Sequence, residues 1–222
     1  MVHDVVNNNE VNGSRRFHFG ILALQGAFQE HIHMLQNIPQ VSSATPIRKV
    51  EQLATIDALI IPGGESTTMA LVAERSGLME PLREFVRSGK PTWGTCAGMI
   101  LLANEANKTK KGGQSLIGGL DITIDSFEST LRIEHVTTSS DDLFPAVFIR
   151  APIISSINNP DIEVLARLEY NVDETDISSI VAVKQDNLLA TAFHPELTND
   201  DRIHKYFVQI TQDYYYSGKK EK

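Results

Sequence analysis

A chain of 222 residues, of which 41% are hydrophobic and 22% are charged, is long enough to form one globular domain with a full core. Its net charge of −8 argues against binding to nucleic acids or anionic membranes, which need basic surfaces. A single cysteine excludes an intrachain disulfide and a multi-cysteine zinc site, and it suits a reducing compartment. We therefore expect a cytoplasmic protein with no metal and no cofactor.

The two ends of the chain predict less structure than its middle. Residues 1–14 are rich in asparagine and lack periodicity. Ser14-Arg15-Arg16-Phe17 resembles a twin-arginine export signal only faintly, because the apolar run that follows is as short as a strand. We expect a flexible extension over residues 1–16, one domain over residues 17–215 and a frayed tail over residues 216–222.

Between the ends, short apolar runs alternate with amphipathic segments, which is typical of an α/β fold with a mixed, mainly parallel sheet flanked by helices. The apolar runs predict strands at residues 17–24, 47–50, 58–61, 91–93, 120–124, 127–133, 146–149, 180–184 and 188–193. Helices are expected at residues 27–37, 51–55, 69–75, 81–87, 99–103 and 202–214.

The first helix carries two histidines on different faces. Phe28, Ile32 and Leu35 follow one another at i, i+4 and i+7 and form its apolar stripe. His31 and His33 are two residues apart and diverge by about 200° around the helix, so they cannot bind one metal ion. We expect both histidines on the solvated surface.

Cys96 lies in the pentapeptide Gly94-Thr95-Cys96-Ala97-Gly98, between a predicted strand and a predicted helix. Flanking glycines permit the tight turn of a nucleophile elbow, which lifts one side chain above a sheet. A thiol at the start of a helix is placed where the helix dipole favours the thiolate. The alternative is a small buried hydrophobic side chain, since free cysteine is often fully buried. From the pentapeptide alone, the two interpretations are equally supported.

Three further motifs follow predicted strands. Gly63-Gly64 is either a plain turn with Ser66 or Thr67 as the helix N-cap, or a ligand site at the carboxyl end of a parallel strand. Arg150 follows a strand and could bind a carboxylate or form a surface salt bridge. His194-Pro195-Glu196 places a carboxylate beside an imidazole, as in a catalytic triad, although the tripeptide alone favours a capped histidine at the start of the last helix.

The order of these motifs resembles the class I, triad-type glutamine amidotransferases. Within that superfamily the chain is similar to the glutaminase subunits of pyridoxal 5′-phosphate synthase, from residue 19 to residue 207. The resemblance rests on Leu22-Ala-Leu-Gln-Gly26, Pro62-Gly-Gly-Glu-Ser-Thr-Thr68, Trp93-Gly-Thr-Cys-Ala-Gly98, Phe148-Ile-Arg-Ala-Pro152 and Ala192-Phe-His-Pro-Glu196. It implies a three-layer class I glutamine amidotransferase-like fold.

The resemblance also implies a role for each matching residue. Cys96 would be the nucleophile, His194 the general base and acid, and Glu196 the residue that orients His194. The N–H groups of Gly64 and Ala97 would form the oxyanion hole. Glutamine would be bound by Gly64, Glu65, Ser66, Ile149 and Arg150.

Ammonia that escapes into water is protonated and loses its nucleophilicity, so a glutaminase of this kind is expected to deliver it directly to a partner. In the resembled family the partner is a (βα)₈-barrel synthase subunit, and Gln25 and Gly26 would lie near the interface. A glutaminase for another acceptor, such as imidazole glycerol phosphate synthase, is a rival interpretation.

One departure from the family pattern follows Ile124. The family carries an Arg-Asn-x-Phe-Gly segment here, whose arginine contacts glutamine, whereas this chain continues as Ile124-Asp-Ser-Phe-Glu128. Arg132 cannot be assumed to replace that arginine. A catalytically impaired, regulatory partner of the synthase is therefore a further alternative.

Overall fold

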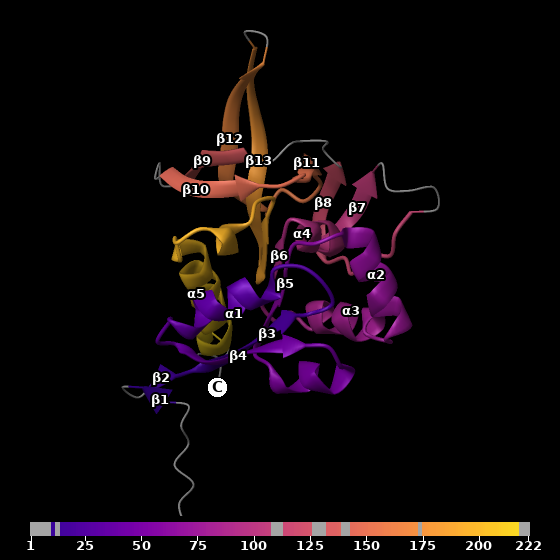
Figure 1. The fold of residues 1–222 in the computed structure, drawn as a ribbon, viewed down its shortest axis with the longest axis vertical. Coiled ribbons are helices and arrows are strands. Elements are labelled where there is room, and N and C mark those ends of the chain that lie inside the picture. The colour runs from indigo at the N-terminus through magenta and orange to yellow at the C-terminus, as the bar shows by residue number, and fades with distance from the viewer. Residues whose placement is uncertain are drawn as a thin grey trace, which may run out of the picture.

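The computed structural model of the chain describes residues 10–11, 14–107, 113–125, 132–138, 143–172 and 175–217. Nine of the described strands form one mixed sheet (Figure 1). From one edge to the other, its strands are β10 (Leu143–Phe148), β9 (Arg132–Thr138), β12 (Glu163–Val172), β13 (Thr175–Gln185), β14 (Leu188–Thr191), β6 (Thr92–Thr95), β5 (Ala58–Ile61), β3 (Phe17–Leu22) and β4 (Val41–Ile47).

The sheet has two halves. One half contains β14, β6, β5, β3 and β4, which pair in parallel. The other half contains β10, β9, β12, β13 and β14, which pair antiparallel. The predicted hairpin is confirmed, because β13 and β14 pair on either side of Asp186-Asn187. The predicted mixed sheet is thus confirmed, and its parallel half is the part that helices cover on both faces (Figure 1).

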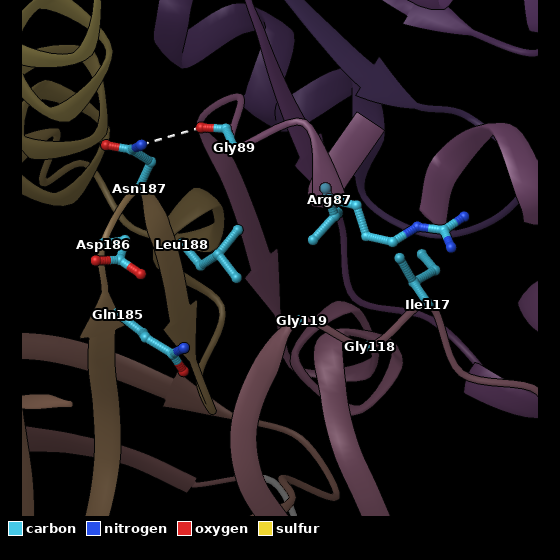
Figure 2. Close-up of a pocket in the computed structure, with 10 residues that line it drawn as sticks. Arg87, Gly89, Ile117, Gly118, Gly119, Gln185, Asp186, Asn187 and Leu188 are labelled. Atoms are coloured by element: carbon cyan, nitrogen blue, oxygen red, sulfur yellow. Dashed lines mark hydrogen bonds between the residues drawn. The ribbon is translucent and has the colours of Figure 1, made fainter. Parts of the chain in front are cut away.

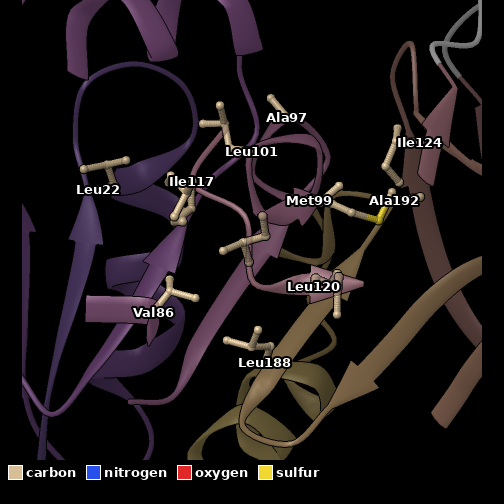
Figure 3. Packing of buried hydrophobic residues seen from close by; sticks show 14 of the residues in the cluster. Leu22, Val86, Ala97, Met99, Leu101, Ile117, Leu120, Ile124, Leu188 and Ala192 are labelled. Carbon is tan, nitrogen blue, oxygen red and sulfur yellow. The ribbon is translucent and has the colours of Figure 1, made fainter. Parts of the chain in front are cut away.

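Those helices complete a three-layer arrangement. On one face lie α1 (Phe28–Gln36) and α5 (Arg202–Ser217), and on the other lie α2 (Ser66–Arg75), α3 (Met79–Arg87) and α4 (Ala97–Leu102). Alternation along β5 supplies both cores: Ala58 and Ile60 pack under α1 and α5, and Leu59 and Ile61 pack under the other three helices. Figure 3 shows part of the second core, where Met99 of α4 points toward the strands.

Smaller elements surround the main sheet. A three-stranded sheet contains β7 (Ala103–Asn107), β8 (Leu120–Asp125) and β11 (Ile153–Ile157), and a two-stranded one contains β1 (Glu10–Val11) and β2 (Ser14–Arg15). Two short 3₁₀ helices are η1 (Val50–Thr55) and η2 (Pro195–Leu197). None of the described helices combines the length and apolar character that a membrane span requires.

The expectation of a strand at residues 47–50 is wrong. The strand is β4, which ends at Ile47, and residues 50–55 form η1. β4 lies at the edge of the sheet, and only Val41 and Ile47 at its two ends are buried. Its central residues are small or polar, so it has no apolar run, and its proline is tolerated because an edge strand pairs on one side only.

Several further strands differ from expectation, and the short strands β1, β2, β7 and β11 were not expected. The strand expected at residues 127–133 is observed as β9, which begins at Arg132, and residues 127–131 lie outside the described part of the chain. β12 was not expected, although it is one of the longest strands in the sheet. Arginine, glutamate and asparagine interrupt its apolar residues, because it pairs in the antiparallel half, where one face of a sheet is often solvated.

The expectation that His31 is solvated is wrong, while His33 is exposed as expected. His31 has no exposed surface and lies on the buried side of α1 with Ile32 and Leu35. It is three residues after Phe28 and four before Leu35, so it belongs to the apolar stripe that those residues define.

Residues near both expected domain ends make contacts with the rest of the fold. Tyr215 and Tyr216 continue α5, and the Tyr215 hydroxyl donates to the Asp57 carbonyl oxygen at 3.2 Å. At the other end, Arg15 forms an ion pair with Asp57, and Arg16 donates to the Val41 carbonyl oxygen at 2.5 Å. Both ends of the described chain therefore pack beside the amino ends of the parallel strands. Residues 1–9 and 218–222 lie outside the described part.

Candidate active site

One cavity lies where the parallel strands end. Its volume is about 520 Å³, and segments that directly follow β3, β5, β6, β10 and β14 line it. Ten of the eleven residues expected at the site line this cavity: Gln25, Gly26, Gly64, Glu65, Ser66, Cys96, Ala97, Ile149, Arg150 and His194. The eleventh, Glu196, is buried behind His194. Carboxyl ends of parallel strands are where α/β sheets bind their ligands.

Cys96 occupies the strained turn of a nucleophile elbow. Its φ is +49° and its ψ is −106°, a conformation rarely adopted by residues other than glycine. The two glycines are needed for packing. A Cβ on Gly94 would lie 2.5 Å from the Gly98 carbonyl carbon, and a Cβ on Gly98 would lie 1.9 Å from the Ile61 carbonyl oxygen. The strand, the turn and the helix can come this close only because side chains are absent.

His194 lies between Cys96 and Glu196. Its Nδ1 is 2.8 Å from Glu196 Oε1, and both side chains are buried. Burial lowers the pKa of His194, but hydrogen bonds and negative charge from Cys96 and Glu196 outweigh burial and raise the pKa to about 10. The imidazole is therefore protonated at neutral pH. It can pair with a thiolate on one side and a carboxylate on the other.

The loop after β5 packs directly against this imidazole. A Cβ on Gly63 would lie 2.2 Å from His194 Cε1, and a Cβ on Gly26 would lie 1.6 Å from the Gly63 carbonyl oxygen. Gly26 also has a φ of +86°. We did not expect Gly63 as a site residue. The pair of adjacent glycines after a strand was the available signal, but it does not tell which glycine faces the site.

The two residues expected to supply the oxyanion hole, Gly64 and Ala97, both line the cavity. The N–H of Cys96 donates to the Thr191 carbonyl oxygen at 2.8 Å and is not available to a substrate. Ala97 is the first residue of α4 and lines the cavity, as does the exposed Gly64. The first N–H groups of a helix have no partner within it.

Glu65, rather than the expected Ser66 or Thr67, is the N-cap of α2. Its carboxylate accepts from the N–H of Thr67 at 3.2 Å and of Thr68 at 2.7 Å. Hydrogen bonding, above all from the Thr68 hydroxyl, holds the pKa of Glu65 below its usual value. The Ser66 hydroxyl donates to Gln114 Oε1 at 3.0 Å. Because the side chains of Glu65 and Ser66 are hydrogen-bonded within the protein, a ligand would contact the main chain of this segment.

Ile149 and Arg150 close the other side of the cavity. The Ile149 carbonyl oxygen is 3.9 Å from Cys96 Sγ. Arg150 has a φ of +46° and an exposed side chain, and no carboxylate among the described residues forms an ion pair with it. The surface salt bridge considered as an alternative is therefore not observed there. A strained arginine beside a cavity is available to a ligand.

A second cavity of about 250 Å³ lies at the opposite, amino ends of β6 and β14 (Figure 2). Two of the polar side chains that line it are hydrogen-bonded to the main chain. Asn187 Nδ2 donates to the Gly89 carbonyl oxygen at 2.9 Å, and Gln185 Oε1 accepts from the Asp121 N–H at 2.8 Å.

In the described part of the chain, no group of histidine, cysteine or acidic side chains is arranged to bind a metal ion.

The fold and the first cavity define a class of protein. A cysteine at a strained strand-to-helix turn, a histidine and a buried carboxylate beside one cavity are the groups that a triad-type hydrolase on an α/β sheet uses. Comparison with known proteins narrows this class. The model of the SNO glutamine amidotransferase family matches residues 21–213, so the chain belongs to that family.

Relatives agree with this assignment. Pyridoxal 5′-phosphate synthase subunit PDX2 of Arabidopsis thaliana is 47% identical, with 87% of this chain and 86% of the relative covered. Subunit PdxT of Dehalococcoides mccartyi is 46% identical, with 88% and 97% covered. A crystal structure of a glutamine amidotransferase superposes with a TM-score of 0.75 at 37% identity, over 87% of this chain and 98% of the other. PurLQS from Thermotoga maritima, at 15% identity and a TM-score of 0.58, shares the fold, with 90% of this chain and 99% of the other covered.

Proposed function

We propose that this chain is the glutamine-hydrolysing subunit of a pyridoxal 5′-phosphate synthase, and that Cys96, His194 and Glu196 are its catalytic triad. The observation that carries the proposal is their convergence: residues almost a hundred positions apart meet beside one cavity, with Cys96 strained and His194 protonated. Membership of the glutamine amidotransferase family and relatives named as synthase subunits support the substrate and the pathway.

In the proposed reaction, the Cys96 thiolate attacks the side-chain amide carbon of L-glutamine, and a C–S bond forms while the carbonyl oxygen becomes an oxyanion. The N–H groups of Gly64 and Ala97 donate to that oxyanion, each with a typical effect of ~10²–10³ on the rate. The intermediate then collapses. The C–N bond breaks, His194 gives its proton to the departing ammonia, and a γ-glutamyl thioester remains.

Water completes the cycle. His194, now neutral, takes a proton from a water molecule that attacks the thioester carbon, and the C–S bond breaks to release L-glutamate. Glu196 accepts the His194 Nδ1–H throughout, so it fixes the tautomer and favours the imidazolium. No step needs a metal ion or an organic cofactor, because the thiol and the imidazole supply both the nucleophile and the acid.

The remaining residues of the cavity are assigned to substrate binding. The main chain of Gly64, Glu65 and Ser66 and the carbonyl of Ile149 are proposed to bind the glutamine head group, and Arg150 its carboxylate. The cavity volume of about 520 Å³ falls within the range of sites that bind small molecules. The guanidinium of Arg150 forms no ion pair with a carboxylate of the described residues, which supports a bidentate contact with the carboxylate of a ligand.

Ammonia transfer requires a partner, and we propose a (βα)₈-barrel synthase subunit that binds in a heteromeric complex in the cytoplasm. Gln25 and Gly26 are proposed to lie at this interface. Gln25 is exposed, and its Oε1 accepts from the Glu65 N–H at 3.3 Å. A partner that moves Gln25 would therefore also act on the loop that carries Gly64. Docking could in this way control the oxyanion hole.

One observation favours a second candidate function. The Arg-Asn-x-Phe-Gly segment expected after Ile124 is absent from the sequence, and the arginine that would contact glutamine is absent with it. Arg132 is the backbone partner of Phe148 in the sheet, one residue before Ile149. The alternative is a regulatory partner that docks on the synthase subunit without rapid turnover.

The test is to mix the purified chain with the synthase barrel of pyridoxal 5′-phosphate synthase and to measure glutamate release. We expect turnover that needs the barrel and is absent in Cys96→Ala. The barrel of imidazole glycerol phosphate synthase serves as the control acceptor. Complex formation without turnover would support the regulatory alternative, and activation by the control barrel alone would assign a different acceptor.

A further inference from the structure

Two buried polar atoms face each other behind the triad. His31 Nε2 lies 3.4 Å from Glu196 Oε2, and neither side chain has any exposed surface. Among the described residues, neither atom has a hydrogen-bond partner, and the contact between the two atoms does not itself have the geometry of a hydrogen bond. Buried polar atoms in native proteins almost always have a partner. We propose that His31 is a positioning residue whose Nε2–H holds the second oxygen of the Glu196 carboxylate.

A third imidazole determines which nitrogen of His31 carries its proton. His31 Nδ1 is 2.9 Å from His204 Nε2, and both rings are buried. Burial, with the charges of His204 and His194 acting in the same direction, holds the pKa of His31 well below its usual value. Burial also lowers the pKa of His204 to about 3, against the opposing charge of Asp201. Both rings are therefore neutral at physiological pH, with one N–H each.

With one proton on each ring, two arrangements are possible. If His31 Nδ1–H donated to His204, the lone pair of His31 Nε2 would face the lone pairs of Glu196 Oε2 in a dry interior, which is unfavourable. In the other arrangement, His204 Nε2–H donates to His31 Nδ1 and His31 Nε2–H donates to Glu196. The hydrogen bonds then run in one direction, from His204 through His31 to the carboxylate.

Trp93 fixes both rings in place. Its ring centroid is 5.3 Å from that of His31 and 4.9 Å from that of His204, both edge-on, and its Nε1–H donates to the Thr191 hydroxyl at 3.2 Å. His31 is on α1, His204 on α5 and Trp93 on β6, three residues before Cys96. The contact therefore joins both helices of one layer to the strand that ends in the elbow.

Holding the second oxygen has a mechanical consequence for the triad. Glu196 Oε1 accepts from His194 Nδ1, and a carboxylate held at one oxygen still rotates about its last torsion, which has a broad energy minimum. A donor at Oε2 fixes the plane of the carboxylate and so the direction in which it holds His194. The groups that face it are His194 beside η2, His31 on α1 and, behind His31, His204 on α5.

This inference rests on the proposed function, because it assigns His31 to the same triad. The test compares three substitutions of His31. Gln places an amide N–H near the position of Nε2, Met fills the same length without a donor, and Asn keeps a polar contact with His204 but is too short to reach Glu196. Circular dichroism and thermal melting identify the variants that fold.

Two readouts are measured on each variant. With the synthase barrel present, we expect H31M and H31N to lose about tenfold or more in kcat, with KM for glutamine within about twofold of wild type. Without the barrel, we expect iodoacetamide to alkylate Cys96 more slowly at pH 7 in the same two variants, because a mobile carboxylate stabilises the imidazolium less well. H31Q should stay close to wild type in both.

The proposal is overturned if H31Q, H31M and H31N behave alike, or if H31N keeps wild-type values. A role limited to filling space or to satisfying His204 predicts that outcome. If H31M or H31N does not fold, the other still differs from H31Q in the donor, and if H31Q does not fold, H31M and H31N are both compared with wild type. Alkylation needs neither partner nor glutamine, so slower alkylation of H31M and H31N together with no wild-type turnover would refute the proposed function and support the role of His31.

Discussion

The two cavities lie at opposite ends of the same strands, and their polar groups are in opposite states. At the carboxyl ends of β6 and β14, Cys96 and Arg150 have positive φ without being glycine, and the Arg150 side chain is not paired with any described carboxylate. At the amino ends, the Asn187 side chain is hydrogen-bonded to the main chain of Gly89 (Figure 2), and the Gln185 side chain is hydrogen-bonded to the main chain of Asp121. One end retains strain and unpaired donors, and the other end has largely satisfied its polar groups.

The two cavities differ in where residues with a strained backbone lie and in whether a turn requires the strain. Positive φ also occurs at the amino end, in Asp186, but this residue is in the tight turn between β13 and β14, where that conformation is needed. Strain at Cys96 and Arg150 has no such role in chain reversal. It persists because the surrounding backbone holds it, which is expected at a functional site.

The largest effect should come from removing the nucleophile. In Cys96→Ala we expect glutamate release with the synthase barrel to fall on the order of 10⁴-fold or more, because no covalent intermediate can form. The measurement is steady-state glutaminase activity of the complex. Alanine keeps the same Cβ, so the thermal midpoint should change little. Activity above about 1% of wild type in this variant would exclude Cys96 as the nucleophile.

A smaller effect should follow from crowding His194. In Gly63→Ala the new Cβ would lie 2.2 Å from His194 Cε1, so the imidazole must move. We expect kcat to fall roughly 10²-fold, since misplacement of a catalytic group by about 1 Å has an effect of that size. Gly89→Ala is the matched control at the amino end. Its Cβ meets nothing within 4 Å, but its φ is +76°.

The two alanine substitutions should therefore separate activity from stability. Gly89→Ala should destabilise the fold by about 1 kcal/mol through its strained backbone and leave kcat unchanged. Gly63→Ala should change kcat more than stability. If both variants lose kcat equally, the two ends of the strands are not independent and the contrast between the cavities fails.

The sequence predicts the carboxyl-end site well, because the motifs carry their own geometry. Glycines around Cys96 and after β5 permit only a few close-packed turns, and each motif follows an apolar run that predicts a parallel strand. The resemblance implied that Cys96 and His194 meet, and this agrees with the rule that parallel strands in one sheet end at the same edge. Their distance along the chain is bridged by the topology.

What the sequence did not predict depends on packing between layers. His31 was expected in solvent because a polar residue in an apolar stripe gives no sign of its partner, and that partner comes from α5, 173 residues further along the chain. β4 lacks an apolar run because it is an edge strand. Gly63 is distinguished from Gly64 only by which of them contacts His194. None of these features is encoded locally.

The raised pKa of His194 should make stability depend on pH. The pKa of His194 is about 10 in the folded protein and 6.5 in the unfolded chain. The contribution of His194 to the free energy of unfolding is therefore fully present below about pH 6.5 and is lost as the pH rises through 10. We expect urea unfolding to report a loss on the order of 3 kcal/mol between pH 7 and pH 10. His194→Gln should show a flatter profile. Equal profiles would mean that the imidazole is not held as the cation.

The smallest effect is expected at the amino-end cavity, and it tests the comparison from that side. Asn187→Ala removes the hydrogen bond to the Gly89 carbonyl oxygen, which is partly buried, and we expect a loss of about 1 kcal/mol in the free energy of unfolding. Glutaminase activity of the complex should be unchanged, because the paired groups at this end hold a turn and touch no substrate. A fall in kcat without a fall in stability would instead show that the second cavity acts on the first, through the strands β6 and β14 that the two cavities share.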